Sequence, residues 1–509
     1  MAISFNSIPS NWRLPLFYVE TDASQAGGLV QEQPALLIGQ KFSAGSAPAD
    51  TPVIIGSLAQ AKTLFGEGSM LERMVSTFLQ NNSVQQIWCG PVAEPSTGVA
   101  ASGNIVFSGP ATASGTLSLY IADQLVEIGV TAGDTAATIA ANVVAAIIAM
   151  TTLPVTAVVD GSSTAKAVLT SRWKGATGND IQVSFNFGGT LAGEAFPGGV
   201  GATITALSGG VGQPSLTNLI AGLGDDEYDF VANPFTDSTS LASIEDEYGF
   251  GDNGRWGWLR QLYGQIWSAR RGTYSDLVTF YQSRNTAQTS ILAIEPTMPT
   301  PVWEVAAAYA AQAARALMND PARPLQTLAL AGVTAAPRAD RFNANERNTL
   351  AIGLATQAVR ADGTVQIERE STTYQTNAFG VSDDSYAVAT TLATLARIFR
   401  ELKSAITTKY PRHKLANNGT QFGAGQAIVT PNIIKAELIA VYDALEEIGL
   451  VENTDQFTSH LVVERSAENP NRVDVLLPPD LVNQLRMFAV LGQFRLQYAD
   501  NASSNALAP

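Results

Sequence analysis

Two glycine-rich stretches come nearest in residue type and spacing to phosphate-binding loops: FPGGVGA (Phe196–Ala202) and SGGVGQP (Ser208–Pro214). A nucleotide-triphosphate loop needs a lysine followed by a serine or threonine after its glycines. A dinucleotide loop must join a strand to the N-terminus of a helix. Neither stretch meets either requirement, so we expect both to be flexible connectors.

The other reactive side chains are too few for a catalytic or metal site. Only two histidines, His413 and His460, and one cysteine, Cys89, are present, so a zinc site would need several carboxylates to complete its shell. His413 also lies in a basic cluster, which disfavours a cation. Asp383 and Asp384 precede a predicted helix, where carboxylates cap backbone amides. We therefore predict no catalytic, metal or cofactor site, and a protein that is not an enzyme.

Composition excludes several classes of protein. The 509 residues suffice for two to four domains, and 46% hydrophobic with 15% charged residues is typical of globular chains. A net charge of −15 argues against a nucleic-acid binder, which needs a basic surface. A single cysteine excludes an intrachain disulfide. Without a signal-peptide pattern or a membrane-length apolar run, the chain is expected to fold in a cytoplasm.

Both ends of the chain have the composition of strands with no nearby partner. Near the N-terminus, Pro9 and Pro15 obstruct a helix, while LPLFYVE (Leu14–Glu20) is rich in strand-forming residues. At the other end, FAVLGQFRLQY (Phe488–Tyr498) has the same character. An apolar strand at a chain end must pair with something or become an aggregation edge. We therefore predict extended terminal arms.

The pattern between the arms predicts an α/β and α+β multidomain fold. Near Pro95 the composition shifts to small uncharged residues, and after Ser215 helix and strand patterns alternate, which favours an open α/β sheet. A mixed-sheet core built from N- and C-terminal parts, with an inserted domain, explains this order. The predicted parts are an N-terminal arm (1–25), the first part of the core (26–95), an inserted outer α+β domain (96–213), an α/β middle domain (214–337), a C-terminal core domain (338–487) and a C-terminal strand arm (488–509).

Two helices with apolar stripes are expected in the last third. Such stripes far more often face a core than bind a ligand. Thr430, Pro431 and Gly449 supply the cap, first position and stop of the second helix. The stripes are Val388, Leu392, Leu395, Phe399, Leu402 and Ile406, then Ile434, Leu438, Val441, Leu445 and Ile448.

One basic run stands out in this acidic chain. It is either a docking surface for an acidic partner or an ordinary solvated helix face. The run consists of Arg397, Arg400, Lys403, Lys409, Arg412 and Lys414.

The order of several short motifs resembles one protein family, the contractile tail sheath of phages and phage-like particles, particularly its Mu-like branch. Each motif alone is weak because no chemistry constrains it, but their number and order make the combination specific. The motifs are RFNANERNTLAIG (Arg341–Gly353), ERESTTYQTN (Glu368–Asn377), KYPRHKL (Lys409–Leu415), GLVEN (Gly449–Asn453) and PPDLVNQL (Pro478–Leu485).

The resemblance implies a structural subunit of the virion tail, assembled in the host cytoplasm. Six subunits form a ring around an inner tail tube, the rings stack helically, and contraction drives the tube through the host envelope. Implied partners are the chain itself, the tube protein, and the baseplate and tail terminator proteins, with no cofactor, nucleic acid or membrane insertion. The basic run becomes the candidate tube contact. The candidate inter-subunit arms are Leu14, Leu16, Phe17, Tyr18, Val19, Phe494, Leu496 and Tyr498.

Three other readings stay open. A close variant of the sheath reading is the sheath of a phage-like bacteriocin or secretion particle. A virion surface-binding, adhesin-like protein would share the Ser/Thr/Gly-rich module at Ser96–Gly212. An α/β enzyme would need a constellation of polar residues that the sequence lacks.

Overall fold

The computed structural model describes residues 33–496, which divide into two compact units. The first unit contains residues 33–319 and 325–392, and the second contains 320–324 and 393–496. The predicted N-terminal arm and the last residues of the C-terminal arm lie outside the described part. The domain boundaries proposed from the sequence stay a prediction.

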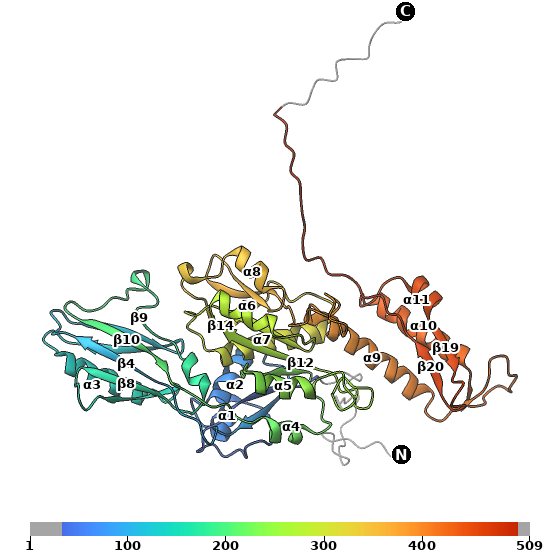
Figure 1. The fold of residues 1–509 in the computed structure, drawn as a ribbon, viewed down its shortest axis with the longest axis horizontal. Helices are drawn as coiled ribbons and strands as arrows, with labels where there is room; N and C mark the ends of the chain where they lie inside the picture. Colours follow the sequence, from blue (N-terminus) through green and yellow to red (C-terminus); the bar gives the residue numbers. More distant parts are fainter. Residues whose placement is uncertain (1–32, 497–509) are drawn as a thin grey trace, which may run out of the picture. The chain divides into compact units, whose positions relative to one another are not determined.

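A six-stranded mixed sheet organises the first unit (Figure 1). Five of its strands are parallel and β2 is antiparallel to β3. Every residue of β1 and β13 is buried, as expected for parallel strands covered on both faces. In the order β13-β12-β11-β1-β3-β2, the strands are Thr289–Ile294, Gln265–Arg271, Phe230–Ala232, Ala35–Gln40, Ile87–Val92 and Val53–Ile55.

The helices of this unit begin at polar caps and bury apolar faces. Side chains of Ser69, Asp237 and Thr273 accept hydrogen bonds from first-turn amides of α2, α5 and α6. The Ala-rich α7 packs against α2 and β12, because small side chains allow close approach. The helices are α1 (Leu58–Phe65), α2 (Met70–Asn81), α4 (Thr217–Leu223), α5 (Ser238–Glu247), α6 (Tyr274–Gln282) and α7 (Val302–Asn319).

A smaller, three-stranded sheet follows α7 in the sequence and completes this unit. It has the order β14-β16-β15, with β14 at Ala329–Thr334, β16 at Thr364–Arg369 and β15 at Thr356–Val359. Helix α8 (Ala344–Leu350) begins at a capping box formed by Asn343 and Glu346.

Residues 96–213 form two antiparallel sheets around α3 (Ala136–Ala149). Thr135 caps this helix, because its side chain accepts a hydrogen bond from the amide of Thr138. One sheet has the order β10-β4-β8-β7 and the other β6-β5-β9. The strands are β4 (Ser102–Ser108), β5 (Gly115–Ile121), β6 (Gln124–Val130), β7 (Val155–Val159), β8 (Lys166–Ser171), β9 (Val183–Phe185) and β10 (Gly201–Ser208).

The glycine-rich stretch Ser208–Pro214 is a packed joint, which corrects the expectation of a flexible connector. Gly210 donates to the side-chain oxygen of Asn179 and accepts from its side-chain nitrogen, at 2.8 and 2.9 Å. The carbonyl of Gly212 accepts from the amide of Ala176 at 2.9 Å. A Cβ on Gly210 would lie 2.7 Å from a backbone oxygen, and Gly212 has φ +95°. Glycine is needed at these positions for the close approach of two backbone segments and for the positive φ. The hydrophobic periodicity of the sequence does not reveal such contacts.

The second unit is built on α9 (Ala389–Lys409), which begins in the first unit, and α10 (Pro431–Glu447), so both predicted helices are confirmed. Ile434, Leu438 and Leu445 are buried in the core. Ile448 is 58% exposed because α10 ends before it. The remaining elements are β17 (Lys414–Leu415), β18 (Ile428–Val429), α11 (Thr454–His460), β19 (Val462–Arg465) and β20 (Val473–Leu476).

An aromatic pair missed by the sequence pattern closes this second core. Tyr442 stacks on Phe457 with ring centroids 3.7 Å apart and planes at 4°. The hydroxyl of Tyr442 donates to the carbonyl of Glu452 at 2.8 Å, which satisfies the polar end of the buried side chain.

Candidate assembly surfaces

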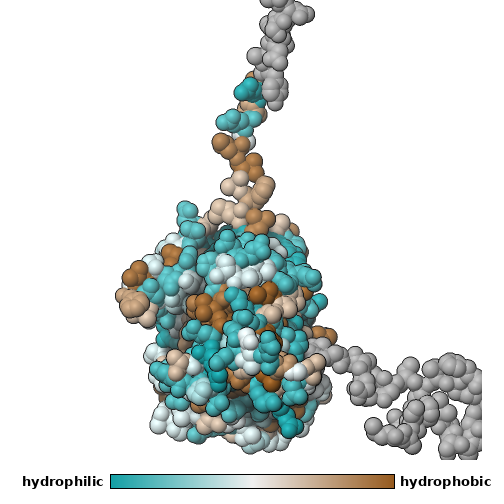
Figure 2. Space-filling view, turned by 90° about the vertical axis from the view of Figure 1, so that its right-hand side faces the viewer, coloured by the Kyte–Doolittle hydropathy of each residue, from teal (hydrophilic) through white to brown (hydrophobic). Residues whose placement is uncertain are grey.

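The C-terminal stretch is the largest exposed run of apolar side chains in the described chain. Phe494 is 86% and Leu496 is 97% exposed, and the described part of the predicted strand Phe488–Tyr498 pairs with nothing as a strand. In Figure 2 the stretch leading into the grey C-terminus is largely brown. Leu485, Met487, Phe488, Val490 and Leu491 are each more than 70% exposed. Apolar exposure on this scale marks an interaction segment.

A two-stranded sheet in the second unit has the complementary property. Strands β19 and β20 pair in register from Val462 opposite Leu476 to Arg465 opposite Val473. Within residues 33–496 neither strand pairs with a third, so both outer edges present unpaired backbone groups. Val462 and Leu476 are 47% and 65% exposed. Val463 of β19 packs against the core of the second unit, so the sheet is held in place while its edges stay free to pair.

The basic run divides into exposed and engaged side chains. Arg397 pairs with Glu401 at 2.8 Å, and Lys409 pairs with Glu437, whose hydrogen bond raises the pKa of Lys409. Lys403, Arg412 and Lys414 are exposed and form no ion pair within residues 33–496.

Arg400 differs from the rest because it is only 7% exposed. The sequence counted it with the surface cations because its helical spacing from Arg397 and Lys403 is regular. Burial removes it from any docking face, so a charge change there would report on folding. Of the other predicted arm residues, Leu14, Leu16, Phe17, Tyr18, Val19 and Tyr498 lie outside the described residues.

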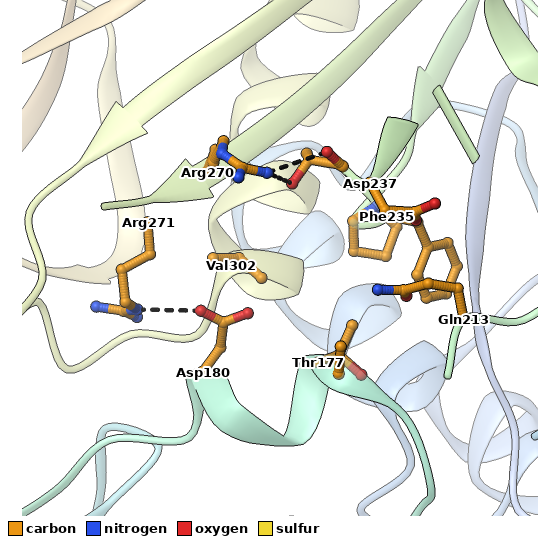
Figure 3. A pocket seen from close by; sticks show the side chains of 11 residues that line it. Thr177, Asp180, Gln213, Phe235, Asp237, Arg270, Arg271 and Val302 are labelled. Atoms are coloured by element: carbon orange, nitrogen blue, oxygen red, sulfur yellow. Dashed lines mark hydrogen bonds and ion pairs between the residues drawn. The ribbon is translucent and has the colours of Figure 1, made fainter. Parts of the chain in front are cut away.

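A cavity of about 320 Å³ lies where the inserted part meets the carboxyl ends of the parallel strands (Figure 3). In open α/β sheets this edge is where ligands bind. Here Nη1 and Nη2 of Arg271 donate to four backbone carbonyls, and its Nε lies 3.5 Å from Asp180 Oδ1. Thr177 Oγ1, from the insertion, donates to Oε1 of Gln40 at the end of β1 at 3.2 Å. The insertion therefore occupies much of the crevice.

Burial raises the pKa of Asp180, and the nearby Arg271 and Arg270 oppose that shift. Phe42 and Trp173 reinforce the joint, since the guanidinium of Arg172 lies 4.2 Å from the Phe42 ring and Trp173 packs edge-on against Trp303. These side chains bind other parts of the same chain, so the crevice is a structural joint.

Across residues 33–496, no three His, Cys, Asp or Glu side chains gather closely enough to hold a metal ion. No helix in the same residues is long and apolar enough to cross a membrane.

Comparisons of this chain with known proteins all match tail sheath proteins. Residues 209–373 match a family model described as phage tail sheath protein central domain, and residues 381–495 match one described as phage tail sheath C-terminal domain. The Mu-like prophage FluMu tail sheath protein of Haemophilus influenzae is 43% identical over 499 residues, which cover 97% of this chain and all of that protein.

Among solved structures, the sheath tail protein from Desulfitobacterium hafniense is 13% identical, with a TM-score of 0.46 over 92% of this chain and 97% of that one. The helical sheath of the anti-feeding prophage in its contracted state is 11% identical, with a TM-score of 0.45 over 96% of this chain and all of that one.

Proposed function

We propose a function on the basis that this chain belongs to the phage tail sheath family. Its subunits polymerise helically around an inner tail tube and contract to drive the tube through the host envelope. The subunit is structural and carries out no catalysis. Its other partners are the baseplate and tail terminator proteins, and it assembles in the host cytoplasm before it resides in the virion. The observation that supports this most directly is the exposed apolar stretch after Leu485.

Strand addition is the proposed link between subunits. The two free edges of the β19–β20 sheet can each accept an extended segment from another subunit. A four-residue strand adds roughly four backbone hydrogen bonds, each contributing about 0.5–1.5 kcal/mol net. Burying the side chains of Phe488, Leu491 and Phe494 adds about 25 cal/mol for each Å² removed from water. The donated end of one subunit and the accepting sheet edge of the next are different surfaces, so the contact is head-to-tail. A head-to-tail contact that does not close on itself propagates into an open helical array.

The tube contact is proposed to use the exposed part of the basic run. Lys403, Arg412 and Lys414 are exposed cations towards the C-terminal end of α9 and in the chain that follows, while Arg397 and Lys409 pair with carboxylates. Exposed charge pairs are weak and salt-sensitive, each contributing about 0–1 kcal/mol. Such a contact holds the sheath on an acidic tube and releases during contraction.

Contraction then requires two packings of one folded subunit. A difference of a few kcal/mol per subunit suffices when it is summed over many copies. The strand links keep subunits connected while their remaining surfaces exchange contacts. No nucleotide is consumed in this scheme, since the stored energy lies in the less stable extended packing.

Negative-stain electron microscopy of the purified chain tests the proposal. Striated tubes of uniform width are expected once the concentration exceeds a threshold, because helical assembly is cooperative. Particles that stay single subunits at every concentration and salt condition would refute self-assembly as the property of this chain.

A further inference from the structure

A rigid loop at the amino end of the six-stranded sheet presents exposed aromatic and aliphatic side chains. The loop runs from Gly249 to Gly264 and contains no regular helix or strand. Trp258 is 71%, Leu259 65% and Phe250 48% exposed. We name these three residues the aromatic loop surface. Tryptophan is enriched at protein interfaces, and a soluble surface rarely leaves one this exposed beside a leucine.

The loop is held rigid by two arginines on its inner side. Arg255 is fully buried, and it donates to Glu247 Oε1 at 2.7 Å and to the carbonyls of Asp226 and Gly224 at 2.6 and 3.0 Å. Arg260 donates to Glu247 at 2.9 Å and to Asp225 at 3.1 Å. A preformed surface loses little entropy on binding, which suits it to a docking role.

The charges around the aromatic loop surface are negative. Asp226, Asp246 and Asp252 are exposed, and Asp252 accepts from the indole nitrogen of Trp258 at 3.1 Å. Both nearby arginines are engaged with carboxylates, as described above. A complementary occupant therefore combines apolar side chains with positive charge.

The N-terminal segment of the chain meets these requirements and starts from the same end of the sheet. Trp12–Val19 reads WRLPLFYV, which includes Arg13, and no acidic residue precedes Glu20. The described chain enters β1 at Pro34, whose carbonyl accepts from the amide of Asp229 at 3.0 Å. The neighbouring Tyr228 lies under the Arg255 guanidinium, 5.6 Å from its ring centroid.

The connecting length also suffices. The 14 residues from Glu20 to Gln33 can span up to about 50 Å when extended. The loop position Trp258 follows the clamped Arg255 by only three residues. A short tether gives the segment a high effective concentration at this surface.

We propose that Trp12–Val19 of the same chain covers the aromatic loop surface in the unassembled subunit and leaves it when a neighbouring subunit accepts the arm. The release step rests on the proposed function, whereas the covering step concerns the single subunit. Covering protects an apolar strand and an apolar surface together, which prevents untimely association before the tube is present.

Cysteine cross-linking of the full chain tests the covering step. In a Cys89→Ser background, Phe17→Cys is combined with Leu259→Cys, or with Ser163→Cys in an exposed loop of the insertion as the matched control. Below the assembly threshold, mild oxidation should join positions 17 and 259 within one chain roughly ten-fold faster than positions 17 and 163. Mass spectrometry of proteolytic fragments and non-reducing gels separate intrachain from interchain products. Equal rates, or products only between chains, overturn the proposal.

Hydrogen exchange provides a second measurement that needs no cysteine. Leu16→Glu with Phe17→Glu should increase exchange across residues 249–264 while leaving β12 and α7 unchanged. Unchanged exchange in the loop contradicts the proposal even if Cys89→Ser fails to fold. Tube formation by microscopy is a separate readout, so failure of the covering step and failure of sheath assembly are distinguishable.

Discussion

The two units of this chain differ in how completely they satisfy their own backbone and apolar surface. In the first, strands β1 and β13 are buried at every residue, and even the polar Gln40 finds partners within the chain. In the second, two two-stranded sheets leave edges open, and an apolar stretch extends into solvent. The first unit buries the central strands of its main sheet and leaves the aromatic loop surface as its exposed exception, whereas the second has the features of a structure completed by other copies.

This difference separates stability from assembly. Substitutions in the first unit should change the free energy of unfolding and leave the links between subunits intact. Substitutions at the tail or at the β19–β20 edges should do the reverse. Substitutions that change one property and leave the other unchanged test that separation.

Charging the tail should abolish polymerisation. Phe488→Asp with Leu491→Asp and Phe494→Asp removes the apolar side chains that strand addition would bury, since all three are more than 80% exposed in the single chain. Sedimentation and electron microscopy should detect soluble subunits at concentrations at which the wild type forms tubes.

The matched control is Ser163→Asp with two further exposed serines of the insertion, Ser114→Asp and Ser162→Asp, which add the same charge elsewhere. The control should assemble normally, and circular dichroism of both variants should equal that of the wild type. Tubes from the triple tail variant would show that the tail is not the link.

Truncating a core aromatic should have the largest effect on stability. Trp303 in α7 is fully buried and packs edge-on against Trp173 with centroids 5.2 Å apart. Trp303→Ala should lower the free energy of unfolding of the first unit by about 3–5 kcal/mol through lost burial and the remaining cavity. Denaturant titration followed by circular dichroism measures this change.

Trp258→Ala is the matched control, because the same residue type is 71% exposed there. Its unfolding midpoint should stay near that of the wild type. Comparable destabilisation by both substitutions would contradict the assignment of Trp303 to the core.

The sequence predicted periodic elements better than particular positions. Apolar stripes located α9 and α10, because burial of one face imposes a regular spacing. The same spacing counted Arg400 as exposed and Ile448 as buried, since it does not show which neighbours cover a side chain or where a helix ends. The packed role of Gly210 depends on a contact with Asn179, which is distant in sequence.

The candidate site was predictable only in part. An apolar chain end without a local partner identified the tail from composition. The open edges of β19 and β20 were not predictable, because an edge is defined by the absence of a neighbour in space. The aromatic loop surface was missed because Trp258 and Leu259 lie in a glycine-rich loop without periodicity.

Reversing the exposed cations should weaken the tube contact without affecting folding. Lys403→Glu with Lys414→Glu changes two exposed charges. Binding to tail tubes should fall several-fold at low salt, and the difference from the wild type should shrink at high salt. Co-sedimentation with tubes over a salt series measures both effects.

Lys166→Glu serves as the control in the insertion, where the side chain pairs with Asp160 at 3.2 Å. It should leave tube binding unchanged. A salt-independent loss of binding in the double variant would argue against an electrostatic contact, and normal binding would exclude these lysines from the tube surface.

The smallest effect is expected where the second unit meets the root of the tail. The Tyr442 hydroxyl donates to the carbonyl of Glu452 at 2.8 Å and accepts from the amide of Asp480 at 3.1 Å, so it fixes the chain just before the exposed stretch. Tyr442→Phe keeps the stacking on Phe457 and removes these bonds. We expect a loss of about 0.5–1.5 kcal/mol in the stability of the second unit.

The same substitution should increase hydrogen exchange at Asp480, because its amide loses its acceptor, while exchange within β1 and β13 stays unchanged. Lys403→Gln, which neutralises an exposed lysine of the same unit, is the control and should leave the unfolding midpoint in place. Tyr442→Phe should also slow tube formation modestly. The chain around Asp480 becomes more mobile, so the tail loses more conformational entropy when it pairs with a neighbouring subunit. If exchange in the first unit rises as well, the two units are coupled in stability, and the separation drawn between them is wrong.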